Sequence, residues 1–251
     1  MTHRFAYKTA GIILCAALLI TALPVNAQYF GRNKVQYDTF NFDVINTKNF
    51  DIYFYPEGED AALMAARMAE RWYSRLSRVF QHDLSGRQIL ILYTSGPHFQ
   101  QTTAIPGTLG EGVGGVTESL KRRIVLPLAA SLEESNHVIG HELVHAFQYD
   151  ITGQYHSDYA RAAPSIQRLP LWFVEGLAEY LSIGPRSPHT SMWMRDILRK
   201  EELPGIQKLN SAKYFPYRYG HAVWAYITGR WGDQTVASIL KRAGRSGDYR
   251  T

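Results

Sequence analysis

HVIGHELVHAFQYD, residues 137–150, decides how the rest of the chain is interpreted. Histidines that are four residues apart stand one turn apart on the same face of a helix. The stretch offers two such pairs, His137 with His141 and His141 with His145. Either pair could bind one metal ion through its ring nitrogens, and the second pair also encloses a glutamate, Glu142. The same spacing also occurs by accident in helices that bind nothing.

The stretch lies inside a predicted helix. Ser131 and Glu134 form the S-x-x-E pattern, in which a hydroxyl and a carboxylate satisfy the free backbone groups at a helix start. An apolar run with helical periodicity follows them. We therefore expect a helix over 132–149, with His141 well inside it.

A second predicted helix, 170–183, supplies acidic residues. Pro170 stands near its first position and Gly184 follows its end, so the start and stop signals agree. Glu175 and Glu179 lie one turn apart in this helix among apolar residues, where two like charges are unfavourable unless cations compensate them. A metal ion held by Glu175, with Glu179 accepting a hydrogen bond from a histidine ligand, would provide that compensation. The alternative is a half-exposed helix whose two glutamates face water.

Strand signals come before most helix signals along the chain. Strands are predicted, from β-branched and aromatic content, at 50–56, 87–95, 115–119 and 122–127. Helices are predicted, from apolar residues at spacings of three and four, at 59–80, 132–149, 170–183, about 190–200, 218–230 and 233–243. This order predicts an α+β fold, in which a small mixed sheet comes first and a mostly helical part follows.

Two glycines stand beside the proposed ligands. Gly140 precedes His141 and Gly176 follows Glu175, and each costs about 1 kcal/mol relative to alanine inside a helix. We expect them to allow the two helices to approach each other closely around the ion. A glycine-rich segment at 107–115 lacks the Lys-Ser/Thr ending of a phosphate loop, so we do not expect it to bind phosphate.

Residues 1–27 have the pattern of a signal peptide. Positive charges come first, an apolar run over 10–23 follows, and a small-residue cleavage site ends at Ala27. The apolar run is shorter than the about 20 residues of an ordinary membrane-spanning helix. We therefore expect export to the periplasm or the cell exterior after cleavage near Ala27, without stable membrane insertion. An uncleaved N-terminal anchor is the alternative.

The remaining residues, 28–251, are expected to form a single domain, which can be the N-terminal part of a longer protein. The only cysteine, Cys15, falls in the signal segment. Disulfides and thiolate metal sites are therefore excluded from the mature chain, and a transition metal must use His, Asp or Glu. The formal net charge of +5 shrinks when the signal segment is removed and forms no Lys/Arg block, so nucleic acid is not an expected partner.

Two motifs together resemble a known family. His141-Glu142-x-x-His145 and the downstream LPLWFVEGLAEY at 169–180 look like the gluzincins, zinc peptidases with a His/His/Glu ligand set. The second motif is most similar to the peptidase-MA-like domains of exported bacterial proteins. The resemblance covers roughly 50–232 and implies a thermolysin-like fold with the zinc site between the two helices. The stretch between the motifs is longer than is usual in the family, which leaves the shape of the substrate cleft open.

The resemblance implies a role for each residue of the two motifs. His141, His145 and Glu175 would be the ligands of one Zn²⁺ ion. Glu142 would be the general base, and Glu179 would be the carboxylate behind the ligands that hydrogen-bonds a histidine. A His/His/Glu set with a water suits zinc best, although not exclusively.

The resemblance also selects between the two histidine pairs. Glu175 is combined in the family with the pair that encloses the glutamate, here His141 and His145. His137 is then expected to be a structural neighbour one turn along the helix. The residues alone leave both pairings open.

A further group is needed for the negative charge of the transition state. In the aminopeptidase branch of the family a tyrosine stands three residues before a glycine, and Tyr217 has this spacing from Gly220. Tyr219 and His221 are nearby alternatives, and a packing role is an alternative for each of them. A strand around 113–117 could be the sheet edge that pairs with an extended peptide, or an ordinary edge strand.

The expected function is therefore hydrolysis of peptide bonds in a peptide or protein substrate. A zinc-bound water would attack the amide carbonyl, while Glu142 takes its proton and Tyr217 or a neighbour stabilises the oxyanion. One alternative is a catalytically silent binding module that keeps the peptidase fold. Another is a domain that positions a C-terminal β-propeller-type region outside this chain. The choice between endo- and exo-cleavage and the oligomeric state stay open.

Overall fold

The computed structural model describes residues 34–110, 112–119, 121–128, 131–153 and 165–250. The expected signal peptide and its cleavage site lie outside the described residues. Within the described part of the chain, no helix is long and apolar enough to cross a membrane. The chain divides into two units, Met1–Val35 and Gln36–Thr251, and the fold described below is that of the second unit.

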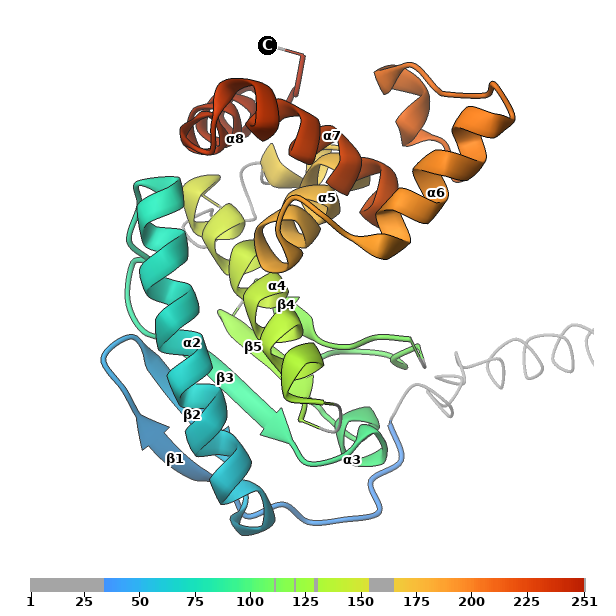
Figure 1. Cartoon of the computed structure of the whole chain (residues 1–251). Helices are drawn as coiled ribbons and strands as arrows, with labels where there is room; N and C mark the ends of the chain where they lie inside the picture. The colour runs from blue at the N-terminus through green and yellow to red at the C-terminus, as the bar shows by residue number, and fades with distance from the viewer. Residues whose placement is uncertain (1–33, 111, 120, 129–130, 154–164, 251) are drawn as a thin grey trace, which may run out of the picture. The chain divides into compact units, whose positions relative to one another are not determined.

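Five strands form a small mixed sheet in the first part of this unit (Figure 1). Their order across the sheet is β1 (Asp43–Asn46), β2 (Phe50–Phe54), β3 (Gln88–Tyr93), β5 (Arg123–Pro127) and β4 (Val116–Glu118). β2, β3 and β5 run parallel, whereas β1 and β4 pair antiparallel with their neighbours. β4 is therefore an edge strand of the sheet that the structure describes.

Helices make up most of the remainder. Their bounds are α2 (Glu59–Phe80), α3 (Gly96–Gln100), α4 (Leu132–Ile151), α5 (Leu171–Ile183), α6 (Pro188–Arg199), α7 (Pro216–Trp231) and α8 (Gln234–Ser246). Short 3₁₀ helices occupy Pro56–Gly58, Ser165–Arg168 and Ile206–Asn210. The fold is thus α+β, with a small mixed sheet first and a mostly helical part after it, and this prediction is confirmed.

The predicted elements are present with small shifts at their ends. α2 has both of its predicted bounds, and Ser131 caps α4 as expected, since its hydroxyl accepts a hydrogen bond from the amide of Glu134 at 3.2 Å. Two elements were not predicted, β1 and α3. β1 is mostly exposed and lacks apolar alternation, and α3 is little more than one turn. Neither leaves a periodic pattern in the sequence.

α2 and α4 lie side by side against one face of the sheet (Figure 1). α2 turns an apolar face to the core and an opposite polar face to water, as its sequence predicts. α4 is different, because it has α2 and the sheet on one side and α5 on another. Every residue from Ile139 to Gln148 is buried, including two histidines and a glutamate. Polar side chains in such a position require partners.

Glycines permit two close contacts between helices. A Cβ atom on Gly176 of α5 would lie 2.3 Å from the carbonyl carbon of Gly220 on α7, and one on Gly220 would lie 2.0 Å from the oxygen of Trp172. The backbones of α5 and α7 are therefore in contact. A Cβ atom on Gly140 of α4 would meet the ring of Trp72 on α2 at 2.6 Å. The expectation that Gly140 and Gly176 bring α4 and α5 together is wrong, because each glycine faces a different helix.

Candidate metal centre

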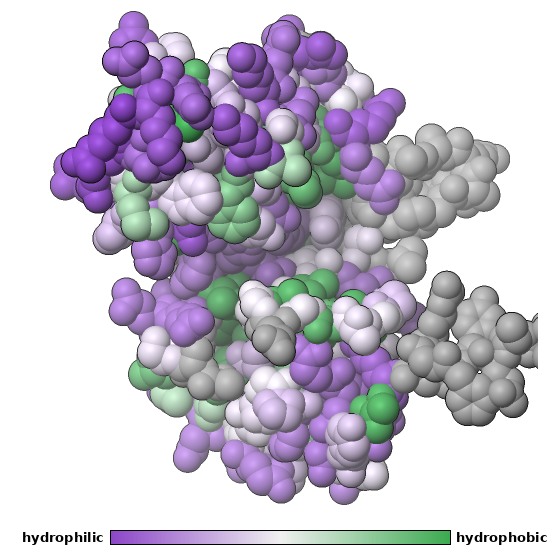
Figure 2. Space-filling view, turned by 90° about the vertical axis from the view of Figure 1, so that its right-hand side faces the viewer, coloured by the Kyte–Doolittle hydropathy of each residue, from purple (hydrophilic) through white to green (hydrophobic). Residues whose placement is uncertain are grey.

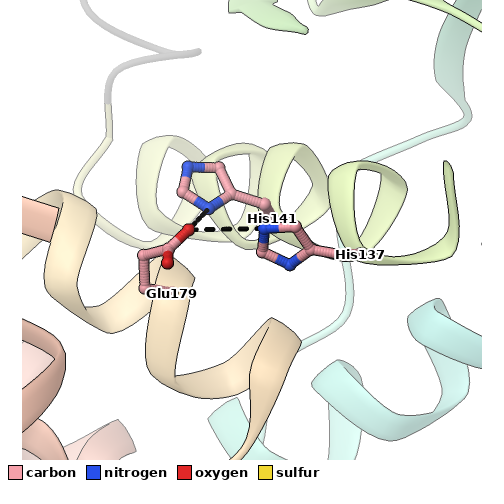
Figure 3. A group of neighbouring side chains, drawn as sticks. All are labelled: His137, His141 and Glu179. Carbon is pink, nitrogen blue, oxygen red and sulfur yellow. Dashed lines mark ion pairs between the residues drawn. The ribbon is translucent and has the colours of Figure 1, made fainter. Parts of the chain in front are cut away.

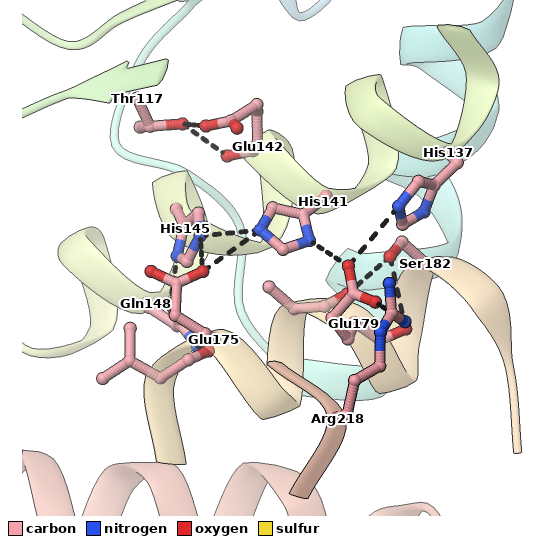
Figure 4. A network of polar contacts seen from close by, with 12 residues as sticks. Thr117, His137, His141, Glu142, His145, Gln148, Glu175, Glu179, Ser182 and Arg218 are labelled. Atoms are coloured by element: carbon pink, nitrogen blue, oxygen red, sulfur yellow. Dashed lines mark hydrogen bonds and ion pairs between the residues drawn. The ribbon is translucent and has the colours of Figure 1, made fainter. Parts of the chain in front are cut away.

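α4 and α5 bring the three predicted ligands together (Figure 4). The Nε2 atoms of His141 and His145 are 3.1 Å apart, and Oε2 of Glu175 lies 3.3 Å from the first and 3.2 Å from the second. Three ligands at about 2.0 to 2.1 Å from one ion in a tetrahedral site are about 3.3 to 3.4 Å apart. The triangle therefore has the dimensions of a group that could hold one metal ion.

Gln148 fixes the orientation of the His145 ring. Its amide nitrogen lies 2.9 Å from the carbonyl oxygen of Val174 and must donate to it, because a carbonyl only accepts. The amide oxygen then faces Nδ1 of His145 at 2.8 Å, so Nδ1 carries the proton when the ring is neutral. Nε2 of His145 therefore turns a lone pair towards the triangle. Gln148 also ties α4 to the backbone just before Glu175.

Glu179 lies on the Nδ1 side of His141. Its Oε1 atom is 3.2 Å from Nδ1, an ion-pair distance, and the negative charge of the carboxylate favours the proton on this nitrogen. Both histidines thus present an unprotonated Nε2 when neutral, and the third member of the triangle, Glu175, presents a carboxylate oxygen. Three acceptors at 3.1 to 3.3 Å repel one another unless a cation lies between them. Protons or a metal ion can supply that charge.

Proton binding measures how strongly the triangle requires a cation. Burial alone would lower the pKa of His141, but hydrogen bonds to Glu175 and Glu179 and the charge of Glu142 raise it to about 10. Burial would also lower the pKa of His145, but the negative charge of Glu175 outweighs this effect, so the pKa of His145 is raised as well. Burial would raise the pKa of Glu175, yet the charges and hydrogen bonds of the two histidines hold it well below its usual range. A divalent ion would take the place of these protons.

A second His/His/Glu group overlaps the first (Figure 3). Oε1 of Glu179 lies 3.4 Å from Nε2 of His137 and 3.2 Å from Nδ1 of His141. This group corresponds to the histidine pairing that the residues alone left open. Its charge balance differs from that of the first, because Nη1 of Arg218 lies 2.7 Å from Oε2 of Glu179. Among the described residues, Glu175 forms no such pair with an arginine or lysine.

Glu142 is held on the β4 side of the cluster (Figure 4). Its carboxylate Oε2 lies 2.7 Å from the hydroxyl oxygen of Thr117 on β4, which can donate to it. A Cβ atom on Gly115 would lie 2.9 Å from Cγ of Glu142. The glycine-rich segment therefore leaves room for this buried side chain. The glycines of this segment are evident in the sequence, but nothing there indicates this role.

Tyr217 is in contact with the cluster. Its ring stacks on that of His141, with centroids 5.9 Å apart and planes inclined by 15°. Burial, followed by the charge of Glu175, raises the pKa of Tyr217 well above its usual range. The hydroxyl therefore keeps its proton and remains a donor.

The two alternatives to Tyr217 have other partners. Tyr219 is buried, and its ring packs against Tyr214 at 5.2 Å. His221 is buried with its Nε2 atom 2.8 Å from the carbonyl oxygen of Gly184, so this nitrogen donates to the end of α5. Both side chains therefore help to pack the helical part.

Three partners of the cluster were missed in the sequence. Gln148 stands three residues after His145 on the same helix, so its spacing could have indicated it. Thr117 and Arg218 come from distant segments, and only the fold brings them to Glu142 and Glu179. No local pattern marks either residue.

The fold and the site define an α+β protein with a buried His/His/Glu group that could hold one metal ion. No protein-family model matches the chain, and no curated protein matches its sequence. What the group can do must therefore be argued from its own geometry. It combines a cation-requiring triangle, a separate buried carboxylate and a phenol that keeps its proton.

Proposed function

We propose that the protein is a zinc-dependent metallopeptidase of the gluzincin type, an exported hydrolase that cleaves peptide bonds. One observation carries the proposal, the convergence of the Nε2 atoms of His141 and His145 and the Oε2 atom of Glu175 within 3.3 Å of one another. His141, His145 and Glu175 would hold the ion. Imidazole and carboxylate donors in a set of three, with no thiolate, suit Zn²⁺. A bound zinc ion supplies Lewis-acid chemistry, which acidifies water and polarises a carbonyl.

The remaining groups suit the steps of amide hydrolysis. Glu142 is the group that accepts the proton of the attacking water and delivers it to the leaving amine nitrogen. Thr117 hydrogen-bonds one oxygen of that carboxylate, which leaves the other oxygen to take the proton. Tyr217 donates its hydroxyl hydrogen bond to the carbonyl oxygen as negative charge develops there, an interaction worth about 3 kcal/mol in comparable sites.

The position of β4 supports an extended peptide as the substrate. β4 is an edge strand of the described sheet, and an edge can pair with an added strand. Thr117 lies on β4 and also contacts Glu142. A peptide paired with β4 would therefore pass beside the proposed general base.

Substitution of the proposed base tests this function. Glu142→Gln keeps the shape of the side chain and removes its basicity, so we expect near wild-type zinc stoichiometry and no hydrolysis of a broad peptide library. Glu134→Gln is the matched control, because it makes the same change at an exposed position of α4. Retained hydrolysis in Glu142→Gln would refute the base assignment. A wild-type protein that binds zinc but cleaves no peptide would instead be a catalytically silent binding module.

A further inference from the structure

A row of aromatic rings leads away from the metal centre. Tyr217 stacks on His141, and Phe215 stacks on Tyr217 with centroids 5.2 Å apart and planes inclined by 30°. Trp193 follows at 5.7 Å from Phe215, inclined by 33°. Phe215 is 42% exposed and Trp193 is 37% exposed, whereas His141 is buried. The row therefore begins at the cluster and ends at the surface.

Local structure holds the outer rings in place. Phe215 is the residue immediately before α7, and Pro216 after it occupies the first helical position, which suits its fixed backbone angle. Trp193 of α6 packs edge-on against the buried ring of Tyr219, at 6.2 Å and 76°. Both outer rings are thus supported by packing on one side and exposed on another. Such a surface costs little conformational entropy when it binds a ligand.

We infer that Trp193, Phe215 and Tyr217 form an aromatic wall that binds large apolar or aromatic side chains of a peptide substrate. The inference rests on the proposed function and names the class of peptide that this site prefers. Partly exposed aromatic rings beside a polar site favour apolar groups, through burial and ring contacts. The wall is continuous with the cluster, because its first ring, that of Tyr217, stacks on His141.

The spacing of the rings fits an extended peptide. Successive centroids in the row are 5.2 to 5.9 Å apart. Alternate side chains of an extended strand recur about every 6.6 Å on one face, so every second residue of a peptide could meet a ring. Backbone pairing with β4 would contribute affinity without regard to sequence, and the aromatic wall would contribute the preference.

The surface view agrees with such a binding mode. Figure 2 shows this side of the molecule hollowed between the helical part above and the sheet part below, with hydrophobic residues at the margins of the hollow. Figure 1 shows α6 and the hairpin of β4 and β5 on the same side. An extended chain that entered between them would have the sheet edge on one side and the helices on the other.

Peptide binding to the Glu142→Gln variant tests the aromatic wall without cleavage. The probes are dye-labelled, end-blocked hexapeptides of Gly and Ser that carry Phe, Leu or Ala at one position in turn, measured by fluorescence anisotropy. We expect the Phe and Leu peptides to bind about tenfold more tightly than the Ala peptide. Adding Trp193→Ala or Phe215→Leu should reduce this preference severalfold. If Trp193→Ala does not fold, Trp193→Met keeps apolar volume and removes the ring.

Trp231→Ala is the matched control. Trp231 is 55% exposed on α7, the helix that carries Tyr217, and also belongs to an aromatic pair, with Tyr226 at 6.1 Å. We expect this variant to keep the full preference for the Phe peptide. An equal loss of the preference for Phe peptides in Trp193→Ala and Trp231→Ala would overturn the inference. The same conclusion would follow if the Glu142→Gln protein itself bound Phe, Leu and Ala peptides equally. A dimer that Trp193→Ala dissociates would also overturn it, since the wall would then serve self-association.

Hydrolysis of the same peptides by the unsubstituted protein separates this inference from the proposed function. Binding that prefers Phe through Trp193, without hydrolysis of these peptides or of the same peptides with free ends, supports the aromatic wall and overturns the peptidase. Hydrolysis that is equal for Phe and Ala peptides, and unchanged in Trp193→Ala, supports the peptidase and overturns the wall. Hydrolysis that favours Phe peptides and loses this preference in Trp193→Ala supports both.

Discussion

His141 belongs to two groups of equal composition, and the fold treats them differently. Each group has two histidines one turn apart on α4 and one glutamate on α5. Glu179 has Arg218 at 2.7 Å, whereas Glu175, among the residues that the structure describes, pairs with two histidines and with no arginine or lysine. One group is therefore balanced by a fixed positive charge and the other requires a mobile cation. Residue type and spacing do not distinguish the two groups. They differ in whether the negative charge of their glutamate is balanced by a positively charged side chain.

Replacing the carboxylates of Glu175 and Glu179, one at a time, should have the largest effect on zinc affinity. Glu175→Gln takes away a proposed ligand, whereas Glu179→Gln takes away a partner of His141. We expect Glu179→Gln to weaken zinc binding by about 10- to 100-fold, as is typical for outer hydrogen-bonding partners, and Glu175→Gln to weaken it further. Competition with a chelator of known zinc affinity measures both. Equal losses would contradict the distinction between the two groups.

The next largest effect should be the change with pH in the unfolding free energy of the metal-free protein. The pKa of His141 is about 10 in the folded protein against an ordinary value of 6.5. Its charged form therefore stabilises the fold fully below about pH 6.5, and this contribution is lost as the pH rises through about 10. Each pKa unit corresponds to about 1.4 kcal/mol. Urea unfolding should show falling stability over this window.

Zinc and one variant provide the controls for that measurement. Saturating zinc should remove the loss at high pH, because the ion takes the place of the proton at His141. Glu175→Gln should reduce the loss in the metal-free protein, because a hydrogen bond that raises the pKa of His141 is weakened. A metal-free stability that does not change between about pH 7 and about pH 10 would refute the charge argument for the triangle.

Gln148→Met should have a smaller effect, limited to the first group. We expect zinc affinity to fall by about tenfold, towards the lower end of the range for orienting partners. In the unsubstituted protein, Gln148 disfavours the tautomer of His145 that carries its proton on Nε2. Nitrogen-15 NMR of the zinc-free variant, above the pKa of His145, should therefore show this tautomer. Gln88→Met is the matched control, because Gln88 is an equally buried amide in β3. A similar loss of zinc affinity in both variants would reduce Gln148 to a packing role.

Arg218→Met should have the smallest effect on the first group, a few-fold change in its zinc affinity. It removes the positive partner of Glu179, so the second group would then lack a cation. Nδ1 of His141 carries the proton while Nε2 binds the first ion, so His137 and Glu179 would have to hold a second ion without it. We expect this variant to bind a second, much weaker equivalent of zinc, detected by calorimetric titration. Adding His137→Ala should abolish that second equivalent. A single equivalent in Arg218→Met would mean that Arg218 does not decide between the groups.

Local signals account for the parts of the site that the sequence predicted. The capping residues of α4 and the four-residue spacing of His141 and His145 depend on one helix only. Glu175 was indicated in the same way within α5. These elements are defined by neighbours in the chain, so their backbone geometry follows from propensity and periodicity.

Parts that depend on distant segments were not predictable. Arg218, which balances the charge of Glu179, lies in the first turn of a different helix, α7, and Thr117 lies in the sheet. The prediction of which helices Gly140 and Gly176 contact was wrong for the same reason. A glycine in a helix indicates a close contact, but the sequence does not say which other helix makes that contact. β1 escaped prediction because an exposed edge strand carries no apolar alternation.

The backbone contact between α5 and α7 determines how the site moves. Helices that pack through side chains can slide past each other when rotamers change. Gly176 and Gly220 leave no side chain between these two helices at their contact, so we expect α5 and α7 to move together. Glu175 and Tyr217 flank this contact on either helix and are carried together. Thermal motion should therefore displace the surrounding loops while the separation of this carboxylate from its phenol stays constant.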